Sequence, residues 1–350
     1  MKAAESVLKS NLVIQTAFLG DLILSIPLLQ RIKKIFPDDK LIVMCKSGLG
    51  EFLLKEQLVD EVIEVEKGSA VSYRQARTAL RAHPLRHVYC VHRSMRSLLF
   101  AAGLKAQKKF GFSSLLGFWI FDEVIDYPTN NPEVLRQMAI LETSDPETLV
   151  QLAAEDYSVL NDAGLPAVPP FFSFERPVRK RVPSKRVGLF PGSVWATKKW
   201  TKAGFAELAV LLIKAGYQID LLGGPTEKKL CDEIAMQAGD VKVLAGSLTI
   251  AETISKLAEY DLVVTNDSAP THMAAYQNTP VLTIFGPTTL KQGFRPWSNN
   301  AVVVENTLLT CRPCGKHGHN VCPLTHHNCM NTISAAEVFA KALQVLNGQR

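Results

Sequence analysis

The chain has no hydrophobic run that is long enough to cross a membrane. A bilayer span needs about 20 consecutive apolar residues. The most apolar stretch near the N-terminus, residues 12–29, is interrupted by Gln15, Gly20 and Asp21. No cleavage site of small residues follows this stretch, so it is not expected to be a signal peptide. We therefore expect a cytoplasmic protein.

Two nucleotide-binding signatures are also missing. No G-x-G-x-x-G follows the opening β-run of either half, which argues against a nicotinamide-dependent oxidoreductase. The G-x-x-x-x-G-K-[ST] spacing of a P-loop is absent. The chain also lacks a basic helix with interleaved aromatic residues, which argues against a zinc-bearing nucleic-acid-binding protein. An NAD-dependent oxidoreductase and a nucleic-acid-binding protein remain as alternatives from other function classes. Binding of NADH, or strongly salt-dependent binding of DNA or RNA, would reveal them.

Positive charge is in modest excess. The formal net charge is +6, with basic clusters at residues 105–109 and 176–186. This favours acidic partners, namely phosphorylated sugars, an anionic membrane surface or nucleic acid, although a solvated basic face without a partner explains it equally well. With 350 residues, 47% hydrophobic and 21% charged, the chain is typical of a folded protein with room for two α/β domains.

Both halves of the chain alternate β-rich runs with helical patterns, which indicates parallel sheets with helices on both faces. In the first half we predict a helix at residues 22–36 and strands at 11–16, 41–45, 61–65 and 87–91. In the second half we predict strands at 186–190, 217–222, 241–244, 262–265 and 281–285. The helices predicted there lie at 202–214, 226–237, 250–257, 270–275 and 334–346.

A proline-rich segment separates the two halves. It contains Pro166, Pro169, Pro170, Pro177, Pro183 and the basic run Arg179-Lys180-Arg181, which is typical of a semi-rigid linker. We expect an N-terminal Rossmann-like domain at residues 1–168, a linker at 169–185, a C-terminal Rossmann-like domain at 186–332 and a final helix at 333–350. Two doubly wound domains facing each other across a cleft would bind a ligand at the carboxyl ends of their strands.

The stretch 263–287 carries the most informative pattern, a strand, a helix start and a second strand. Asp267 or Ser268 can cap the helix, and Pro270 lies in its first turn, where a missing N–H has no cost. The free N–H groups and positive dipole end of such a helix suit an anionic ligand group. A carboxylate beside that site would repel phosphate unless it contacts something else, such as sugar hydroxyls. The pattern therefore predicts a nucleotide-sugar pocket.

Three other segments follow predicted strands and offer polar groups. Asp21 is a candidate general base, or only an acid that stabilises a helix N-terminus. The loop at 191–200 is either an exposed basic loop or a diphosphate site, with backbone, hydroxyl and ammonium groups from Gly192, Ser193, Thr197, Lys198 and Lys199. Glu227, after Gly223-Gly224-Pro225, can accept ribose hydroxyls or merely cap its helix.

Cysteine and histidine are concentrated near the C-terminus. Four soft ligands lie within 19 residues, at Cys311, Cys314, Cys322 and Cys329, with four histidines among them. They fit a structural zinc site in a reducing compartment, although their spacing is not that of a zinc finger or ribbon. Reduced thiols packed in a compact loop are the alternative. Without an export signal, the seven cysteines of the chain do not predict a disulfide framework.

Four short sequence blocks, taken in their order along the chain, carry a family resemblance. They lie at residues 20–27 (GDLILSIP), 191–200 (PGSVWATKKW), 265–272 (TNDSAPTH) and 285–288 (FGPT). Together, and over essentially the full length, they resemble glycosyltransferase family 9, the bacterial lipopolysaccharide heptosyltransferases. The cysteine-rich loop and the P-G-S block are more similar to the heptosyltransferase II branch than to heptosyltransferase I.

The resemblance implies a GT-B fold, with an N-terminal acceptor domain and a C-terminal nucleotide-sugar domain. It implies an inverting transferase that moves L-glycero-D-manno-heptose from ADP-heptose to the inner core of lipopolysaccharide, adding the second heptose. Heptosyltransferase I, or another family 9 transferase with a different acceptor, is the alternative. The acceptor would be Kdo- and heptose-bearing lipid A at the inner membrane surface, which the protein would contact peripherally. No cofactor, no divalent metal at the diphosphate and no nucleic acid are implied.

The resemblance also implies roles for particular residues. Asp21 matches the catalytic base, with Gly20 on the acceptor side, and Lys198 matches the lysine that neutralises the leaving diphosphate, with Lys199 as the other candidate. Asp267 matches the acid that contacts the heptose. The remaining donor-binding residues would be Gly192, Ser193, Thr197, Gly224, Glu227, Ser268, Ala269, Thr271 and His272. His272 is also explained by packing on its helix face. Ala269 departs from the glycine common in the family, which would tighten the donor loop.

Overall fold

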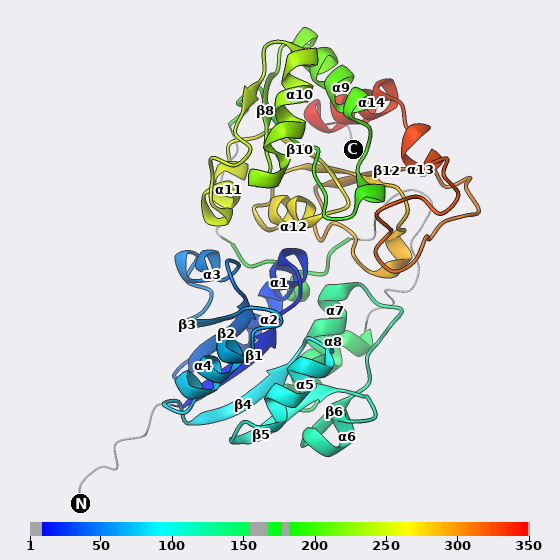
Figure 1. Cartoon of the computed structure of the whole chain (residues 1–350). Coiled ribbons are helices and arrows are strands. Elements are labelled where there is room, and N and C mark those ends of the chain that lie inside the picture. The colour runs from blue at the N-terminus through cyan, green and yellow to red at the C-terminus, as the bar shows by residue number, and fades with distance from the viewer. Residues whose placement is uncertain (1–8, 155–164, 166, 177–181, 349–350) are drawn as a thin grey trace, which may run out of the picture. The chain divides into compact units, whose positions relative to one another are not determined.

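Two parallel β-sheets, one in each half of the chain, organise this computed structural model (Figure 1). The structure describes residues 9–154, 165, 167–176 and 182–348. These fall into two compact units, the first with residues 9–154 and 169–175, and the second with 165, 167–168, 176 and 182–348. Each unit is an α/β Rossmann-like fold, as the alternation of strands and helices predicts.

The first unit contains a six-stranded sheet with the strand order β3-β2-β1-β4-β5-β6, in which every pairing is parallel. The central strand carries Leu12, Val13 and Ile14, which are fully buried, as expected for a strand covered by helices on both faces. The strands are β1 (Ser10–Gln15), β2 (Lys40–Lys46), β3 (Glu61–Val65), β4 (Leu85–Cys90), β5 (Ala106–Phe112) and β6 (Glu123–Ile125).

Short amphipathic helices cover this sheet. One apolar core joins the strands to buried residues of α4, α5 and the segment that follows α6. The helices are α1 (Leu19–Leu24), α2 (Ile26–Ile35), α3 (Glu51–Lys55), α4 (Ala70–Leu80), α5 (Met95–Ala102), α6 (Gly117–Ile120), α7 (Glu133–Met138) and α8 (Pro146–Ala154). Two 3₁₀ turns, η1 (Ala139–Leu141) and η2 (Pro170–Phe172), complete the unit.

The helix predicted at residues 22–36 is divided in two at Ser25, which ends α1 and begins α2. The Ser25 hydroxyl is 2.9 Å from the carbonyl oxygen of Asp21 and 2.5 Å from Oε1 of Gln137 on α7. The prediction of one continuous helix was therefore wrong. A side chain from a helix far along the chain stabilises the break, and the hydrophobic period alone does not reveal it.

The second unit repeats the architecture with the strand order β12-β11-β10-β7-β8-β9, again with parallel pairings only. Its central strands β7 and β10 are almost wholly buried. The strands are β7 (Arg186–Phe190), β8 (Gln218–Leu221), β9 (Lys242–Val243), β10 (Leu262–Asn266), β11 (Val281–Phe285) and β12 (Ala301–Glu305).

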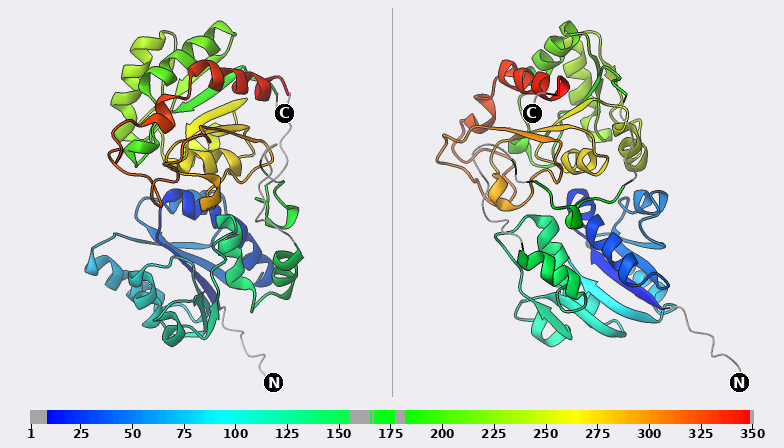
Figure 2. Two further views of the ribbon diagram at one scale, coloured as in Figure 1. Left: turned by 90° about the vertical axis from the view of Figure 1, so that its right-hand side faces the viewer. Right: turned by 180° about the vertical axis from the view of Figure 1, so that it is seen from behind.

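The C-terminal helix of the second unit packs beside α9, and both contribute to one apolar core (Figure 2). The helices are α9 (Lys202–Lys214), α10 (Lys228–Ala238), α11 (Ile250–Leu257), α12 (Ala269–Tyr276), α13 (Asn328–Asn331) and α14 (Ala335–Leu346). The 3₁₀ turns are η3 (Ala196–Lys198), η4 (Pro225–Glu227) and η5 (Leu290–Gln292).

Most of the predicted elements are confirmed. Five match to the residue, namely the strands at 61–65, 186–190 and 281–285 and the helices at 202–214 and 250–257. The helix predicted from residue 226 instead begins with the turn η4, and the strand predicted at 241–244 is only two residues long. Of the proposed linker, Pro177 and Arg179-Lys180-Arg181 lie outside the described residues, as does Pro166 just before it. The domain boundaries stay a prediction.

Candidate functional site

Asp21 lies in α1, directly after the carboxyl end of β1. Its Oδ2 accepts a hydrogen bond of 3.2 Å from the backbone N–H of Phe18, so the predicted helix-terminus contact is made. Burial and the neighbouring carboxylate of Glu133 raise the pKa of Asp21 to about 7, because both disfavour the charged form. A carboxyl group with a pKa near neutrality is well matched to proton transfer at neutral pH.

Glu133, on α7, is the second carboxylate of this region, and the sequence analysis did not single it out. It is buried; its Oε2 accepts hydrogen bonds from the hydroxyl of Tyr127 (2.9 Å) and Nη1 of Arg136 (3.3 Å). Gln137 donates to Oε1 of Glu133 (3.1 Å) and to the carbonyl oxygen of Asp21 (3.3 Å). Burial raises the pKa of Glu133, although Arg136 acts in the opposite direction. The network ties α7 to α1 and keeps two carboxylates close together.

The carboxyl ends of β1 and β4 carry a second polar cluster in the same unit. Oγ1 of Thr16 lies 2.8 Å from Nδ1 of His92 and 3.2 Å from Oγ of Ser97, and Ser94 lies 3.0 Å from Ser97. Burial, with a smaller effect of Lys67, lowers the pKa of His92 to about 4, so the imidazole is neutral at pH 7. These groups offer neutral hydrogen-bonding atoms at the end of the sheet where open α/β folds bind ligands.

In the second unit, Lys198 and Asp267 form a largely buried ion pair. Nζ of Lys198 lies 2.6 Å from Oδ2 of Asp267, and the two side chains are 12% and 4% exposed. The same Oδ2 accepts a 2.6 Å hydrogen bond from the hydroxyl of Thr288, which follows β11. The sequence analysis predicted the first two residues as site residues, but not that they pair with each other, and it did not include Thr288.

Asn266, the last residue of β10, holds the loop that carries Lys198. Its Oδ1 accepts from the backbone N–H of Trp200 (2.9 Å), and its Nδ2 donates to the carbonyl oxygens of Pro191 (2.9 Å) and Gly192 (3.2 Å). Because Asn266 is fully buried, these bonds have little competition from water. The strand end therefore fixes both ends of the loop at residues 191–200.

Glu227 packs against the glycines that the sequence singled out. A Cβ atom on Gly192 would lie 2.3 Å from Cγ of Glu227, and one on Gly223 would lie 2.7 Å from its Cβ. Oε2 of Glu227 accepts a 2.9 Å hydrogen bond from the backbone N–H of Gly224. The structure thus brings Gly192, Gly224 and Glu227 together beside the carboxyl ends of β7 and β8.

The predicted anion-binding helix is α12, and Ser268 is its N-cap residue. The Ser268 side chain makes no capping hydrogen bond, and Ala269 begins the helix. Thr271 is fully buried; its hydroxyl contacts the carbonyl oxygen of Asn266 (3.2 Å). His272 is buried too, with no hydrogen-bond partner at Nδ1, and burial lowers its pKa to about 4. A neutral imidazole cannot supply charge to a phosphate.

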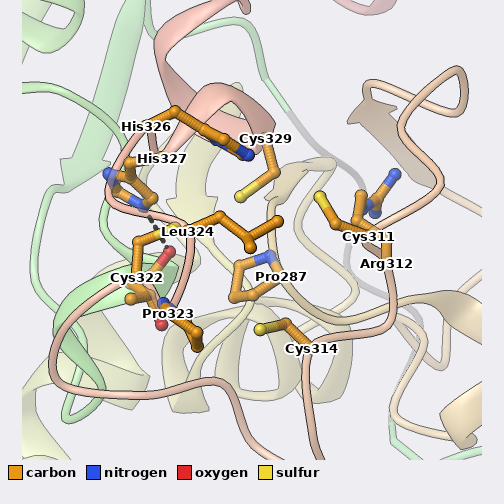
Figure 3. A pocket seen from close by; sticks show the side chains of 11 residues that line it. Pro287, Cys311, Arg312, Cys314, Cys322, Pro323, Leu324, His326, His327 and Cys329 are labelled. Atoms are coloured by element: carbon orange, nitrogen blue, oxygen red, sulfur yellow. Dashed lines mark hydrogen bonds between the residues drawn. The ribbon is translucent and has the colours of Figure 1, made fainter.

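The four C-terminal cysteines line one small cavity of about 20 Å³, together with His326, His327 and Leu324 (Figure 3). All four are free thiols, and Cys329 is buried. Among the residues that the structure describes, no three His, Cys, Asp or Glu side chains are grouped so as to hold a metal ion. The alternative of reduced thiols in a compact loop describes this arrangement, and the zinc site stays a prediction.

This cysteine-rich loop supports the loop that carries Lys198. Thr197 exchanges hydrogen bonds with the backbone of His319, and Nε2 of His327 lies 2.7 Å from the carbonyl oxygen of Thr197. Arg312 donates to the carbonyl oxygens of Thr288 (2.7 Å) and Gly286, and to Oε2 of Glu305 (2.6 Å). The cysteine-rich loop therefore helps to hold both Thr197 and Thr288, which flank the Lys198–Asp267 pair.

The two units thus carry complementary chemistry. The first offers a carboxyl group suited to accept a proton, and the second offers an ammonium group, a carboxylate and a helix N-terminus within one small region. Ser193 is buried in the same loop as Lys198, whereas Lys199 makes no ion pair with the described carboxylates. Gly20 adjoins Asp21 in α1. Such groups can activate a hydroxyl and stabilise a departing diphosphate.

Comparison with known proteins finds similarity to heptosyltransferases. The model of glycosyltransferase family 9 (heptosyltransferase) matches residues 73–324. Lipooligosaccharide heptosyltransferase 2 of Campylobacter jejuni is 35% identical over 179 residues, which are 49% of this chain and 54% of that protein. The match therefore spans about half the length of that relative. The enzyme of the same name from Haemophilus influenzae is 23% identical over 88% of this chain and 92% of its own length.

Among solved structures, that of Escherichia coli ADP-heptose LPS heptosyltransferase II matches with a TM-score of 0.72 at 22% identity, over 97% of this chain and 99% of that one. The likeness covers both units and confirms the GT-B fold class expected from the sequence. No helix among the described residues is both long enough and apolar enough to cross a membrane.

Proposed function

Since the chain belongs to glycosyltransferase family 9, the heptosyltransferases, we propose that it transfers L-glycero-D-manno-heptose from ADP-heptose to the inner core of lipopolysaccharide. We further propose that it adds the second heptose, because the relatives compared above are heptosyltransferases 2 or II. A family 9 transferase that adds the first heptose, or that uses another acceptor, is the alternative. Because the chain belongs to this family, we no longer consider an NAD-dependent oxidoreductase or a nucleic-acid-binding protein as its function.

The observation that carries the proposal is the buried Lys198–Asp267 pair beside α12. The ammonium group of Lys198 and the N-terminus of α12 both favour the negative charge of a diphosphate. Oδ2 of Asp267 is occupied by Lys198 and Thr288, while no described residue donates to Oδ1. This oxygen can accept a hydroxyl of the heptose. One site thereby binds both parts of a nucleotide sugar.

The reaction requires one base and one stabilised leaving group. The carboxylate of Asp21 takes the proton from an acceptor hydroxyl, whose oxygen forms a bond to the anomeric carbon of the heptose. The bond from that carbon to the phosphate oxygen breaks on the opposite side, and ADP leaves with the electron pair, so the anomeric configuration inverts. Lys198, loop N–H groups and the helix terminus stabilise the developing charge. No cofactor is needed for these steps.

Product analysis by mass spectrometry tests the proposal. The protein is incubated with ADP-heptose and Kdo-bearing lipid A, with or without a first heptose. We expect one heptose to be added, with release of ADP, only to the acceptor that already carries a heptose. Addition to the acceptor without heptose would assign the first transfer instead. No transfer to either acceptor would refute the proposed donor and acceptor pair.

We place this reaction at the cytoplasmic face of the inner membrane, with the protein in peripheral contact with the bilayer. Donor nucleotide sugars are polar, whereas the proposed acceptor is anchored in lipid, so the enzyme must work at the boundary between the two. The positive net charge of +6 suits an anionic membrane surface. No nucleic acid is proposed as a partner.

The pH dependence of the reaction should report the carboxylate pair of the first unit. Since Asp21 acts as a base only when ionised, we expect kcat/KM to rise with pH and to level off above pH 7, its pKa being about 7. Glu133→Gln removes the neighbouring negative charge that raises this pKa, so the rise should move to lower pH. The matched control is Glu142→Gln, which changes a half-buried acid of the same unit that does not act on the pKa of Asp21. An unshifted profile in Glu133→Gln would show that the two carboxylates are not coupled.

A structural zinc at Cys311, Cys314, Cys322 and Cys329 is a separate proposal. The four thiols surround a cavity large enough for one ion, but they are not grouped as ligands, so binding would have to draw them inward. We expect elemental analysis to find about one zinc per chain, and a chelator to lower the melting temperature. Cys322→Ser should lose the metal, whereas Cys90→Ser, in β4, should keep it. Zinc far below one equivalent in the native chain would leave reduced thiols as the correct interpretation.

A further inference from the structure

One segment of the first unit contains many basic residues and no acidic residue. Between Glu66 and Asp122 there is no aspartate or glutamate. The same segment contains ten basic residues: Lys67, Arg74, Arg77, Arg81, Arg86, Arg93, Arg96, Lys105, Lys108 and Lys109. In a chain with a net charge of only +6, this is a strong local excess of positive charge, which favours an anionic partner.

The fold gathers much of this segment on one side of the first sheet. Buried residues of α4 (Ala76, Leu80) and α5 (Leu98, Phe100), together with Phe121 after α6, enter the same apolar core under the sheet. Helices α5 and α6 also contact each other. The outer sides of α4, α5 and α6 therefore belong to one face of the unit, which we call the α4–α5–α6 face; Figure 1 labels these three helices.

Six basic residues lie on or next to these helices. None of them forms an ion pair with a carboxylate of the described residues, whereas Arg31, Arg86 and Lys108 in the same unit do. Three of the six lie over aromatic rings, at 4.1 to 5.7 Å from the ring centroids, and Nη1 of Arg77 also donates to the carbonyl oxygen of Gly103. These contacts hold the side chains but do not neutralise their positive charge. The six are Arg74, Arg77, Arg81, Arg93, Arg96 and Lys105.

Large apolar side chains stand among these charges. Leu115, Phe118 and Trp119, in and just before α6, are 92%, 66% and 88% exposed. Gly117 is buried beneath them, and a Cβ there would lie 2.9 Å from the carbonyl oxygen of Phe112, so close packing of this turn leaves its neighbours outside. On α5, Met95 and Leu99 are exposed and, four residues apart, share one side of the helix with Arg96.

Exposed tryptophan, phenylalanine and leucine beside unpaired arginines are the combination that an anionic lipid surface binds. The rings and aliphatic chains enter the boundary between headgroups and acyl chains, while the cations bind the headgroup phosphates. A nucleic acid would use the charges but gain little from Leu115 or from Met95 and Leu99. A second copy of this chain would bring the same positive charges together.

We infer that the α4–α5–α6 face docks the protein on the anionic lipid bilayer, with Leu115, Phe118 and Trp119 inserted at the headgroup level. This inference rests on the proposed function in one respect, because a lipid-anchored acceptor gives the docking its purpose. The surface itself is defined by charge and exposure alone, so its binding to vesicles can be measured without any acceptor.

Vesicle binding of the full chain tests the inference. We expect it to co-sediment with vesicles of phosphatidylethanolamine and phosphatidylglycerol, and much less with pure phosphatidylcholine vesicles or at high salt. Leu115→Ser with Trp119→Ser should weaken binding at least about tenfold. Arg74→Gln with Arg96→Gln should weaken it by about fivefold for each residue. The matched control is Leu308→Ser, which changes a leucine that is 89% exposed in the second unit.

Three results would overturn the inference. The first is wild-type vesicle binding by the Leu115→Ser, Trp119→Ser variant, or no binding by the native chain. The second is concentration-dependent dimerisation of the native chain that this variant loses, which would make the face a contact between copies. The third is RNA binding as tight as vesicle binding. With a soluble, delipidated acceptor the variant should keep wild-type turnover. If the native chain does not turn over that acceptor but still binds vesicles, the proposed function is wrong, whereas the inference about the docking face is supported.

Discussion

Replacing Asp21 by asparagine should lower kcat by about 10²–10⁴-fold, the range that a positioned general base contributes. Asparagine keeps the size of the side chain and can still contact the N–H of Phe18 through its amide oxygen, but it cannot take a proton. Asp21→Ala should show a loss of the same order. Affinity for ADP, measured by calorimetry, should be unchanged in both variants, because the proposed ADP site lies in the other unit.

The control for this prediction is Asp38→Asn, which removes an exposed carboxylate after α2 in the same unit. It should leave kcat and melting temperature unaltered. Removing Asp21 also relieves the burial of an ionisable group whose pKa is raised to about 7. At pH 8 the variant should therefore be at least as stable as the native chain. Near-wild-type turnover in a well-folded Asp21→Asn protein would require a different base.

The elements that the sequence predicted well are those whose conformation depends on residues close to them in the sequence. The runs at 186–190 and 281–285 are short, largely apolar and followed by turn-forming glycine and proline, which is typical of buried parallel strands. The run at 61–65 has two glutamates, but its valines and isoleucine favour a strand. The helix at 250–257 follows Thr249, its N-cap residue, whose side chain accepts a hydrogen bond from the backbone N–H of Glu252. In these cases local chemistry and the final fold agree.

The features that were missed depend on residues far apart in the chain. Ser25 divides a helix because it bonds Gln137, 112 residues later. Glu133 affects the pKa of Asp21 only because α7 packs against α1. No period or motif around residue 133 marks it as part of the site. The absence of acidic residues from Lys67 to Phe121, in contrast, is visible in the sequence, but its meaning depends on the placement of α4, α5 and α6 on one face.

In the proposed donor site, too, the sequence predicted the residues but not the contacts between them. The sequence motifs identified Lys198 and Asp267 separately, each after its own strand, and the carboxyl ends of parallel strands meet at one edge of the sheet. Their direct contact, across 69 residues of sequence, is a property of the fold. Thr288 lies in a motif that was noticed, yet its role as a second donor to Asp267 depends on the loop after β11.

Lys198→Met should weaken ADP binding about 10- to 100-fold and slow transfer by about 10²–10³-fold. The first figure corresponds to one lost charge-assisted hydrogen bond of about 1.5–3 kcal/mol, and the second to one lost stabilising donor in the transition state. Calorimetry with ADP and single-turnover kinetics measure the two effects. Lys199→Met is the matched control, because Lys199 lies next in sequence and does not pair with Asp267. The reverse pattern would assign the diphosphate to Lys199.

A loss of stability could imitate this result, because Lys198→Met leaves the Asp267 carboxylate buried without its cation. Removing one partner of a buried ion pair costs about 3–5 kcal/mol. The double variant Lys198→Met, Asp267→Asn removes both charges, while the Thr288 hydroxyl can still donate to the amide oxygen of the new side chain. We expect the double variant to regain most of the melting temperature but none of the affinity for ADP. If the melting temperature and the affinity for ADP were both recovered, Lys198 would only stabilise the fold. A lysine that binds the diphosphate directly cannot be replaced by removing its carboxylate partner.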